Sequence, residues 1–338
     1  MSHIENGRSV ARTLLVGDMH NKVSVLDRAD RVLRSQKEMG SPVDRVVFLG
    51  DLLNEFGYTA RMEMKSFSTL ESWVWEHKKE YEVIVLAGNH DLAYVVNRSD
   101  PDYDVLRYIC PGPTAQSVSL LHGRARALFA GVAVALEGGV LCSHAGFTHG
   151  WLETRVPERW RGSAKSIVDY TNSLVADDNM LPLVDVGYAR GGMRGVDPSP
   201  CWADMIELME DAEMGYAQVV GHTPRDRAGY YAGDGCELWF CDTNSHLGSR
   251  HGSKYGNGDM LVYEYSVEEP KGASEGAEAK VGGAESGYFT TEFLQPGFTL
   301  SYSKDEDGRV IGTEYKSADG SVRAAFKVVN PGKGIKND

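Results

Sequence analysis

Apolar residues in the first part of the chain occur as short runs that alternate with helical spacing. Residues 13–16 form a short apolar run, and apolar positions recur at a helical interval across 23–39. This succession predicts a strand, a loop and a helix. The pattern returns with a run at 45–49 and a helical stretch at 61–77, and a third run spans 82–87. Strands separated by helices predict an α/β architecture with crossover connections.

The alternation lapses over residues 98–126, where Pro101, Pro111 and Pro113 interrupt any regular period. We expect either a cap over the neighbouring loops or a plain surface loop there. Runs at 129–136 and 140–143, joined by Glu-Gly-Gly, predict a β-hairpin.

The later part of the chain is richer in short strands. A helix is expected near residues 202–214, and strands are expected at 217–220, 237–241 and 260–265. Together they predict a second sheet that faces the first.

Composition divides the chain into three segments. Residues 1–266 carry the periodic patterns and form the expected main domain. Residues 267–287 are rich in Glu, Gly, Ala and Ser without an apolar period, which predicts an acidic linker. Residues 288–338 alternate β-prone residues with turn signals, which predicts a small β-rich C-terminal appendage.

Charge and cysteine content narrow the class of protein. The chain of 338 residues has a formal net charge of −13, which disfavours nucleic acid as a partner. Its longest apolar run, 127–136, is too short for a membrane span of about 20 residues. The first residues do not resemble a secretory signal, and the five cysteines show no C-x-x-C spacing. We therefore expect a cytoplasmic protein with reduced thiols and no membrane partner.

Potential metal ligands follow each of the three early strands. Asp18 and His20 follow the first, Asp51 the second, and Asn89 and His90 the third. Loops at the carboxyl ends of strands are where ligands bind in α/β sheets. Two later segments, Ser-His-Ala-Gly and Gly-His-Thr, add His144 and His222. Oxygen and imidazole ligands in this mixture suit Mn²⁺, Fe or Zn²⁺.

Five short motifs in order, G-D-M-H-N, G-D-L-L-N-E, G-N-H-D, S-H-A-G and G-H-T, resemble the blocks of the calcineurin-like metallophosphoesterases. The resemblance covers about residues 12–265 and is nearest to the PPP-type phosphatases and the bacterial symmetrical diadenosine-tetraphosphatases. It implies a two-sheet β-sandwich flanked by helices, with residues 1–266 as the catalytic domain. It also implies two divalent metal ions, with Mn²⁺ expected first and Fe or Zn²⁺ as alternatives.

The resemblance assigns a metal-binding role to six residues. It implies that Asp51 bridges both ions, because two dications about 3.5–4 Å apart need shared anionic charge between them. One ion is then held by Asp18 and His20, and the other by Asn89, His144 and His222.

The resemblance also implies catalytic and substrate-binding residues. His90 resembles the histidine that protonates the leaving group. Asn54 stands where PPP-type enzymes have an aspartate that orients this histidine, and its amide carbonyl is expected to accept the imidazole N–H. Asp91 is expected to support the loop or the helix start.

The residue after Asn54 departs further from the family pattern. Glu55 stands where an arginine usually holds phosphate, and a glutamate repels an anionic substrate. Arg190 and Arg194, in a Gly-rich loop, are the candidates to bind the phosphoryl group in its place.

Three functions follow from the resemblance. The first is hydrolysis of phosphomonoesters on a phosphoprotein or a small molecule, by attack of a metal-bound hydroxide on phosphorus. The second keeps this chemistry for a dinucleoside polyphosphate or phosphodiester, with residues 98–126 shaping the pocket. The third is a non-catalytic scaffold that retains the fold.

Overall fold

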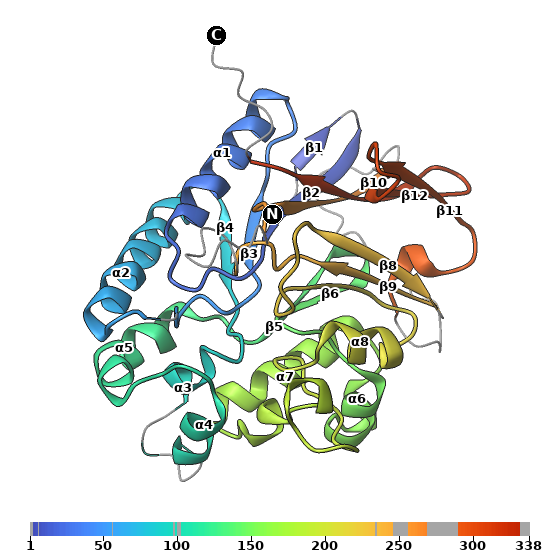
Figure 1. The fold of residues 1–338 in the computed structure, drawn as a ribbon. Coiled ribbons are helices and arrows are strands. Elements are labelled where there is room, and N and C mark those ends of the chain that lie inside the picture. Colours follow the sequence, from blue (N-terminus) through green and yellow to red (C-terminus); the bar gives the residue numbers. More distant parts are fainter. Residues whose placement is uncertain are drawn as a thin grey trace, which may run out of the picture.

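The chain builds two β-sheets that face each other and carry helices on their outer sides, as the computed structural model in Figure 1 shows. The structure describes residues 3–5, 7–55, 57–96, 99, 103–233, 235–245, 256–268 and 290–331. Of the predicted linker, only residues 267 and 268 are described, and the rest of it lies outside the described residues.

The first sheet has the strand order β11-β12-β13-β10-β2-β3-β4, with β1 paired to β2. Strands β2, β3 and β4 are parallel to one another, whereas β10 is antiparallel to both β2 and β13. The strands are β1 (His3–Glu5), β2 (Arg8–Val16), β3 (Arg45–Phe48), β4 (Glu82–Val85), β10 (Met260–Glu268), β11 (Phe298–Lys304), β12 (Val310–Ser317) and β13 (Val322–Val329).

The second sheet has the order β5-β6-β7-β9-β8. The predicted hairpin is confirmed, because β5 and β6 pair antiparallel. Strands β6, β7 and β9 run parallel to one another. The strands are β5 (Ala133–Leu136), β6 (Val140–Ser143), β7 (Ala217–Val220), β8 (Gly229–Gly233) and β9 (Cys236–Phe240). Strand β10, which we expected in this sheet, pairs with β2 in the first one instead.

Helices cover the outer faces of both sheets. In Figure 1, α1, α2 and α5 lie beside β3 and β4, and α6, α7 and α8 lie below the second sheet. The α-helices are α1 (Ser24–Glu38), α2 (Ala60–His77), α3 (Leu92–Val95), α4 (Tyr103–Ile109), α5 (Ala115–Leu128), α6 (His149–Arg155), α7 (Ala164–Ala176) and α8 (Met205–Asp211). Short 3₁₀ turns occur at Glu137–Gly139, Glu158–Trp160, Leu181–Val184, Tyr188–Arg190 and Glu292–Leu294.

Residues 98–126 differ from the sequence prediction, because α4 and most of α5 occupy them. The prolines at 111 and 113 lie between these helices, so they end one and precede the other without breaking either. Thr114 caps α5, since its hydroxyl oxygen accepts a hydrogen bond from the backbone N–H of Ser117 at 3.0 Å. Val118 and Leu121 then bury the inner face of α5.

Alternation along β2 separates the two cores. Leu14 and Val16 pack toward the helices, whereas Leu15 joins the core between the sheets. This follows from the two-residue period of a strand, which sends successive side chains to opposite faces. Trp239 from the second sheet and Phe326 from β13 stack in the same inter-sheet core, with ring centroids 5.7 Å apart.

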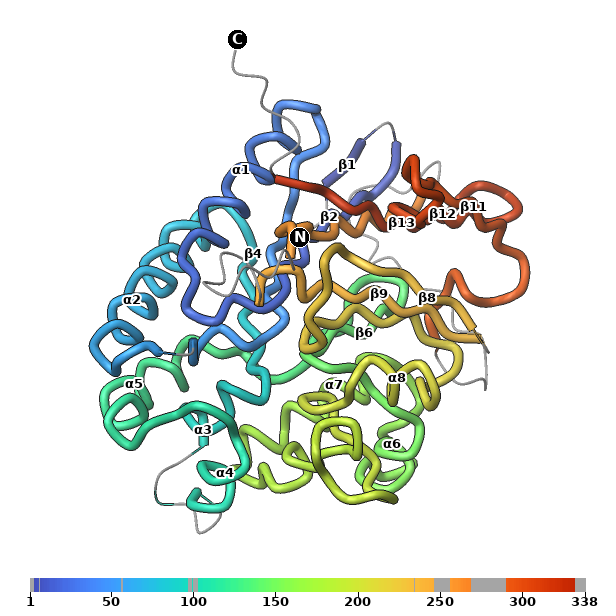
Figure 2. Tube along the Cα trace, viewed as in Figure 1, coloured from blue at the N-terminus to red at the C-terminus, as the bar shows by residue number. Residues whose placement is uncertain are grey.

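The β-rich C-terminal segment continues the first sheet. Strand β13 pairs with β10 from Met260↔Val329 to Val267↔Val322. Figure 2 shows the red C-terminal strands and the blue N-terminal strands in the same sheet, where β10 pairs with both β13 and β2. The strands of this end of the chain therefore share one sheet with the strands that carry the site loops.

None of the helices in the described part of the chain is long and apolar enough to cross a membrane. All five cysteines are buried free thiols.

Glu237 on β9 is a buried carboxylate with an incomplete set of partners. Its Oε1 accepts a hydrogen bond from the Tyr230 hydroxyl at 2.8 Å, but its Oε2 has no partner among the described residues. Burial raises the pKa of Glu237 from 4.5 to about 7. The folded state therefore keeps a proton that the unfolded chain has already lost, and stability falls as the pH rises from 4.5 to 7.

We expect Glu237→Gln to remove this loss, because the amide keeps the contact with Tyr230 without a charge. Urea unfolding of the metal-free protein should give equal free energies for variant and wild type near pH 4. The variant should become more stable by up to about 3 kcal/mol near pH 8. Exposed Glu314 on β12 supplies the control, Glu314→Gln, which should show no such trend. A difference independent of pH would contradict the assignment.

Candidate metal centre

The candidate site lies where parallel strands of both sheets end. The loops after β2, β3 and β4 carry the first three sequence motifs, and the loops after β6 and β7 carry the last two. Parallel strands present their carboxyl ends at one edge of a sheet, so the two sheets bring five loops to one place. The structure thus brings together all six residues expected to bind metal.

The backbone of these loops is held in an uncommon conformation. Asp51, Asn54 and His222 have φ angles of 51°, 62° and 64°, and His20 and Asn21 have 44° and 60°. Positive φ is rare for residues other than glycine and costs on the order of 1 kcal/mol or more each. Of the described non-glycine residues with positive φ, only Asp178 lies outside these loops. Strain concentrated in this way is typical of a functional site.

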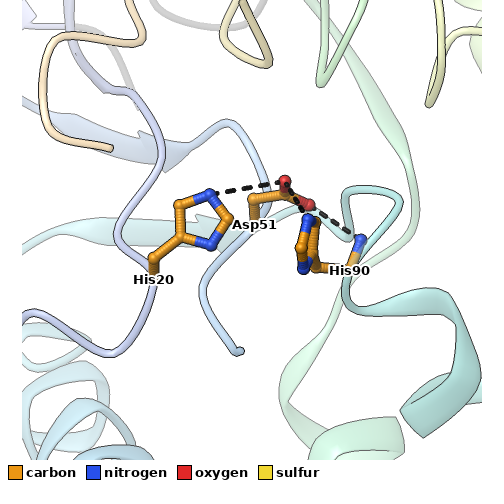
Figure 3. Close-up of side chains that lie close together, drawn as sticks. All are labelled: His20, Asp51 and His90. Atoms are coloured by element: carbon orange, nitrogen blue, oxygen red, sulfur yellow. Dashed lines mark hydrogen bonds and ion pairs between the residues drawn. The ribbon is translucent and has the colours of Figure 1, made fainter. Parts of the chain in front are cut away.

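Asp51 belongs to both groups of potential ligands in this cluster, and Figure 3 shows it between His20 and His90. Its Oδ1 accepts the backbone N–H of His90 at 2.9 Å. Its Oδ2 lies 3.3 Å from Nε2 of His144 and 3.7 Å from Nε2 of His20. Asp51 belongs both to a ligand group with His20 and His90 and to one with His144 and His222. This is the position that a bridging carboxylate requires.

The second group gathers around His144, which is fully buried. Its Nε2 lies 3.0 Å from Nδ1 of His222 and 3.1 Å from the terminal amide of Asn89. Its Nδ1 lies 3.0 Å from the carbonyl oxygen of Leu49, which is the contact that orients a ligand histidine and leaves Nε2 for a metal.

Asp18 and His20 lie on the other side of Asp51. Oδ2 of Asp18 is 3.8 Å from Nε2 of His20, and Oδ1 accepts the backbone N–H of His222 at 3.0 Å. Nδ1 of His20 lies 2.9 Å from the carbonyl oxygen of Asn54, so Nε2 again faces the cluster.

Two glycines let the loops approach this closely. A Cβ on Gly88 would lie 2.3 Å from Oδ1 of Asp51, and a Cβ on Gly221 would lie 2.2 Å from Oδ1 of Asp18. Neither position tolerates a side chain, so the glycines in these motifs serve the site directly.

The residues present fit divalent cations. Oδ2 of Asp18 and Nε2 of His222 are buried and have no hydrogen-bond partner among the described residues. Such orphaned polar atoms cost free energy unless another group satisfies them. Carboxylate, amide and imidazole donors that converge on a buried point match the ligand preferences of Mn²⁺, Fe and Zn²⁺.

The electrostatics of the metal-free cluster show the same need. Burial raises the pKa of Asp18 well above its ordinary range, and the charges of Asp242 and then Asp51 add to this. Burial also acts on Asp51, but His144, His90 and His20 together hold its pKa well below the usual range. Carboxylates buried in this way are stabilised by positive charge placed close to them, which is what divalent cations supply.

His90 and Asn54 meet differently from the sequence expectation. The side-chain N–H of Asn54 donates to the backbone carbonyl of His90 at 2.7 Å, and Oδ1 accepts the hydroxyl of Tyr94 at 2.8 Å. The expected contact between the Asn54 carbonyl and the imidazole is therefore wrong, because the amide oxygen meets the Tyr94 hydroxyl and the amide N–H meets the His90 backbone instead of the ring. Nδ1 of His90 has no partner among the described residues, and burial, with the charges of His20 and Arg190, lowers its pKa to about 4.

Asp91 supports the loops, as expected. Its carboxylate accepts backbone N–H groups of Leu52, Leu53 and Gly88 at 3.0–3.2 Å and holds the second and third motifs together. Burial and the charge of Asp51 raise its pKa to about 7.

Lys22 is a site residue that sequence reasoning missed. Its Nζ pairs with Glu55, the residue that replaces the family arginine, and also donates to the carbonyl oxygen of Ser245 at 3.1 Å. The signal was present in the sequence as a lysine two positions after His20, but only the fold shows that it reaches Glu55 across two loops.

The two candidate arginines occupy different surroundings. Nη2 of Arg190 donates to the Thr223 hydroxyl at 2.9 Å and to the carbonyl oxygen of His222 at 3.2 Å, and Nε pairs with Asp204 at 2.8 Å. Arg190 thus lies against a metal-ligand loop. Arg194 is exposed and makes no contact of this kind within the described parts of the chain.

Residues 11–246 match the family described as calcineurin-like phosphoesterase. Among solved structures, a cold-active protein tyrosine phosphatase is 16% identical, with 77% of this chain and 76% of that chain covered and a TM-score of 0.44. A metallophosphoesterase from Sphaerobacter thermophilus is 12% identical, with 94% and 88% covered and a TM-score of 0.27. A dimetal phosphatase from Danio rerio is 12% identical, with 76% and 94% covered and a TM-score of 0.31. The comparison with curated proteins gave no match.

Asp51→Asn should weaken the binding of both ions, because it removes the charge that lies between the two ligand groups. We expect affinity for Mn²⁺ to fall by more than about 100-fold. Loss of a residue that only hydrogen-bonds to a metal ligand typically lowers metal affinity by about 10–100-fold, and loss of a direct ligand should cost more. Titration calorimetry on chelator-stripped protein measures this. Exposed Asp169→Asn on α7 is the matched control. Two ions bound by Asp51→Asn with unchanged affinity would show that Asp51 does not bridge.

Proposed function

Because this chain belongs to the calcineurin-like phosphoesterase family and is a metal-dependent phosphoesterase, we propose that it hydrolyses phosphomonoesters in the manner of PPP-type phosphatases. The observation that supports this proposal is the position of Asp51, whose Oδ2 lies 3.7 Å from Nε2 of His20 and 3.3 Å from Nε2 of His144, within reach of both proposed ligand sets. When bound, two divalent ions activate water for attack on phosphorus and neutralise charge on the phosphoryl oxygens. Mn²⁺ is the proposed metal, with Fe or Zn²⁺ as alternatives.

The residues of the chain divide the remaining work. Asp18, His20, Asn89, His144 and His222 hold the ions at the buried end of the site. Asp91 and the two glycines keep the loops at the spacing that a shared carboxylate needs. Exclusion of bulk water by the surrounding core strengthens each electrostatic contact with the phosphoryl group.

His90 is the proposed acid that protonates the leaving oxygen. Burial keeps its imidazole neutral in the substrate-free protein, since its pKa lies at about 4. A phosphoryl group with negative charge beside the ring favours the cationic form and raises this pKa when substrate binds. Asn54 positions the acid through the His90 backbone carbonyl.

Arg190 is the proposed phosphoryl-binding cation. Its Nη2 contacts lie on the loop that carries His222, and its charge contributes to the lowered pKa values of His90 and His222. The proposed partner is therefore a phosphorylated small molecule or phosphoprotein, in keeping with a net charge of −13 that disfavours nucleic acid.

Chelator-stripped protein, supplied again with Mn²⁺, should hydrolyse an aryl phosphate and a phosphopeptide faster than diadenosine tetraphosphate. Asp51→Asn serves as the inactive control. Preference for the dinucleotide would favour a dinucleoside polyphosphate or phosphodiester hydrolase. Two bound ions without turnover of any substrate would favour a non-catalytic scaffold.

His90→Asn should lower kcat by about 10²–10⁴-fold and leave metal content unchanged, because it removes the proton donor but no proposed ligand. The loss should be larger for phenyl phosphate than for p-nitrophenyl phosphate, since a poorer leaving group depends more on protonation. Equal losses for both esters would dismiss His90 as the acid.

Arg190→Gln should raise KM for p-nitrophenyl phosphate by about tenfold, the equivalent of about 1.4 kcal/mol for a charge-assisted contact. Arg194→Gln is the matched comparison and should change KM less, because Arg194 is exposed. A larger effect of Arg194→Gln would reverse the assignment.

A further inference from the structure

A small cavity adjoins the metal centre on the side of His90. It has a volume of about 170 Å³ and is lined by Asn54, Glu55, Gly57, Tyr58, Glu63, His90, Pro111, Gly112, Thr114 and Ser117. We propose that this cavity receives the leaving group of the phosphomonoester and that Glu55 selects neutral or ammonium-bearing leaving groups over anionic ones. This inference rests on the function proposed above.

The cavity and the metal centre share His90 and Asn54. Nε2 of His90 lies 3.9 Å from Oδ2 of Asp51, and His90 also lines the cavity. If the phosphoryl group binds at the metal centre with its leaving oxygen toward His90, the rest of the ester lies in this cavity. A cavity of about 150 Å³ is large enough to bind benzene, so this volume suits a small alcohol.

Two carboxylates give the cavity wall its charge. Glu63 is only 4% exposed, and its Oε1 accepts the backbone N–H of Asn54 at 3.1 Å. The same oxygen lies 3.0 Å from the Tyr94 hydroxyl, whose single proton it shares with Oδ1 of Asn54. Glu55 lies on the same wall. The described lining residues include no lysine or arginine. A carboxylate or second phosphate on the leaving group would face like charge in a partly desolvated place.

Lys22 pairs with Glu55 but is not itself part of the cavity lining. The Lys22 and Glu55 side chains are 15% and 22% exposed, and the lysine also donates to the carbonyl oxygen of Ser245. Lys22 does not line the cavity, so its charge offsets that of Glu55 without offering an anion a direct contact. Changes at the two residues should therefore shift selectivity in opposite directions.

The remaining lining supplies hydroxyl groups that accept hydrogen bonds, and a close contact between Gly112 and Asn54. The hydroxyls of Thr114 and Ser117 lie 2.8 Å apart at the start of α5. Gly112 closes against Asn54, because a Cβ there would lie 2.9 Å from the asparagine Cβ. Donor groups of an amino alcohol or polyol thus meet carboxylate and hydroxyl oxygens.

The test compares kcat/KM of the Mn²⁺-loaded full chain for O-phosphoethanolamine and 2-phosphoglycolate, whose small leaving groups differ mainly in charge. Wild type should favour O-phosphoethanolamine by about tenfold. Glu55→Gln should reduce this preference by about fivefold, and Lys22→Gln should increase it. Glu38→Gln is the matched control, because Glu38 is exposed at the end of α1 and precedes β3, at the edge opposite the site.

The outcomes separate this inference from the function on which it rests. Hydrolysis of p-nitrophenyl phosphate checks the function by itself. If that ester is cleaved but wild type and Glu55→Gln show the same preference for O-phosphoethanolamine over 2-phosphoglycolate, the selective role of Glu55 is overturned. The proposed function then still stands. Opposite shifts in Glu55→Gln and Lys22→Gln support the selective role. Absence of hydrolysis of every monoester overturns the function and the inference together.

Discussion

Two carboxylates, Asp18 and Asp51, are almost completely removed from water, and the rest of the structure depends on how their charge is balanced. An isolated buried carboxylate is too costly to keep, so cations must meet it there. His144, His90 and His20 lie around Asp51 and lower the pKa of its carboxyl. Nε2 of His144 also lies 3.0 Å from Nδ1 of His222, and Oδ2 of Asp18 and Nε2 of His222 have no hydrogen-bond partner among the described residues. Divalent ions resolve both problems at one place.

This requirement explains why so much of the fold ends at the same edge. Parallel strands in both sheets present the ligand loops, and glycines at 88 and 221 remove the side chains that would separate them. Asp91 holds two of these loops by three backbone hydrogen bonds. The strained φ angles of Asp51 and His222 are sustained by this surrounding scaffold. Hydrogen bonds and close packing thus fix the positions of these loops, and electrostatic catalysis depends on groups that are already in place.

The surroundings of Asn54 show how the departure from the family pattern at this position affects neighbouring residues. In this chain Asn54 binds Tyr94, Glu63 and the His90 backbone, so it organises a wall. The next residue, Glu55, turns to Lys22 and not to a phosphate. The departures from the family pattern at these two positions therefore form one connected arrangement around the cavity beside His90.

Short-range patterns were enough to predict α1, α2, the parallel strands and the ligand motifs, because periodicity and glycine-terminated strands are local properties. The two prolines between α4 and α5 misled the prediction, since a proline can separate helices as readily as break one. Placement of β10 in the first sheet required the pairing with β2.

The sequence by itself determined which side chains were available to bind metal and in what order along the chain. The tertiary structure alone decided that Lys22 meets Glu55 and that Tyr94, not His90, occupies the Asn54 carbonyl. Contacts of this kind join residues more than thirty positions apart, and no local period encodes the distance between two loops. They arise only when the sheets pack and bring the strand ends together.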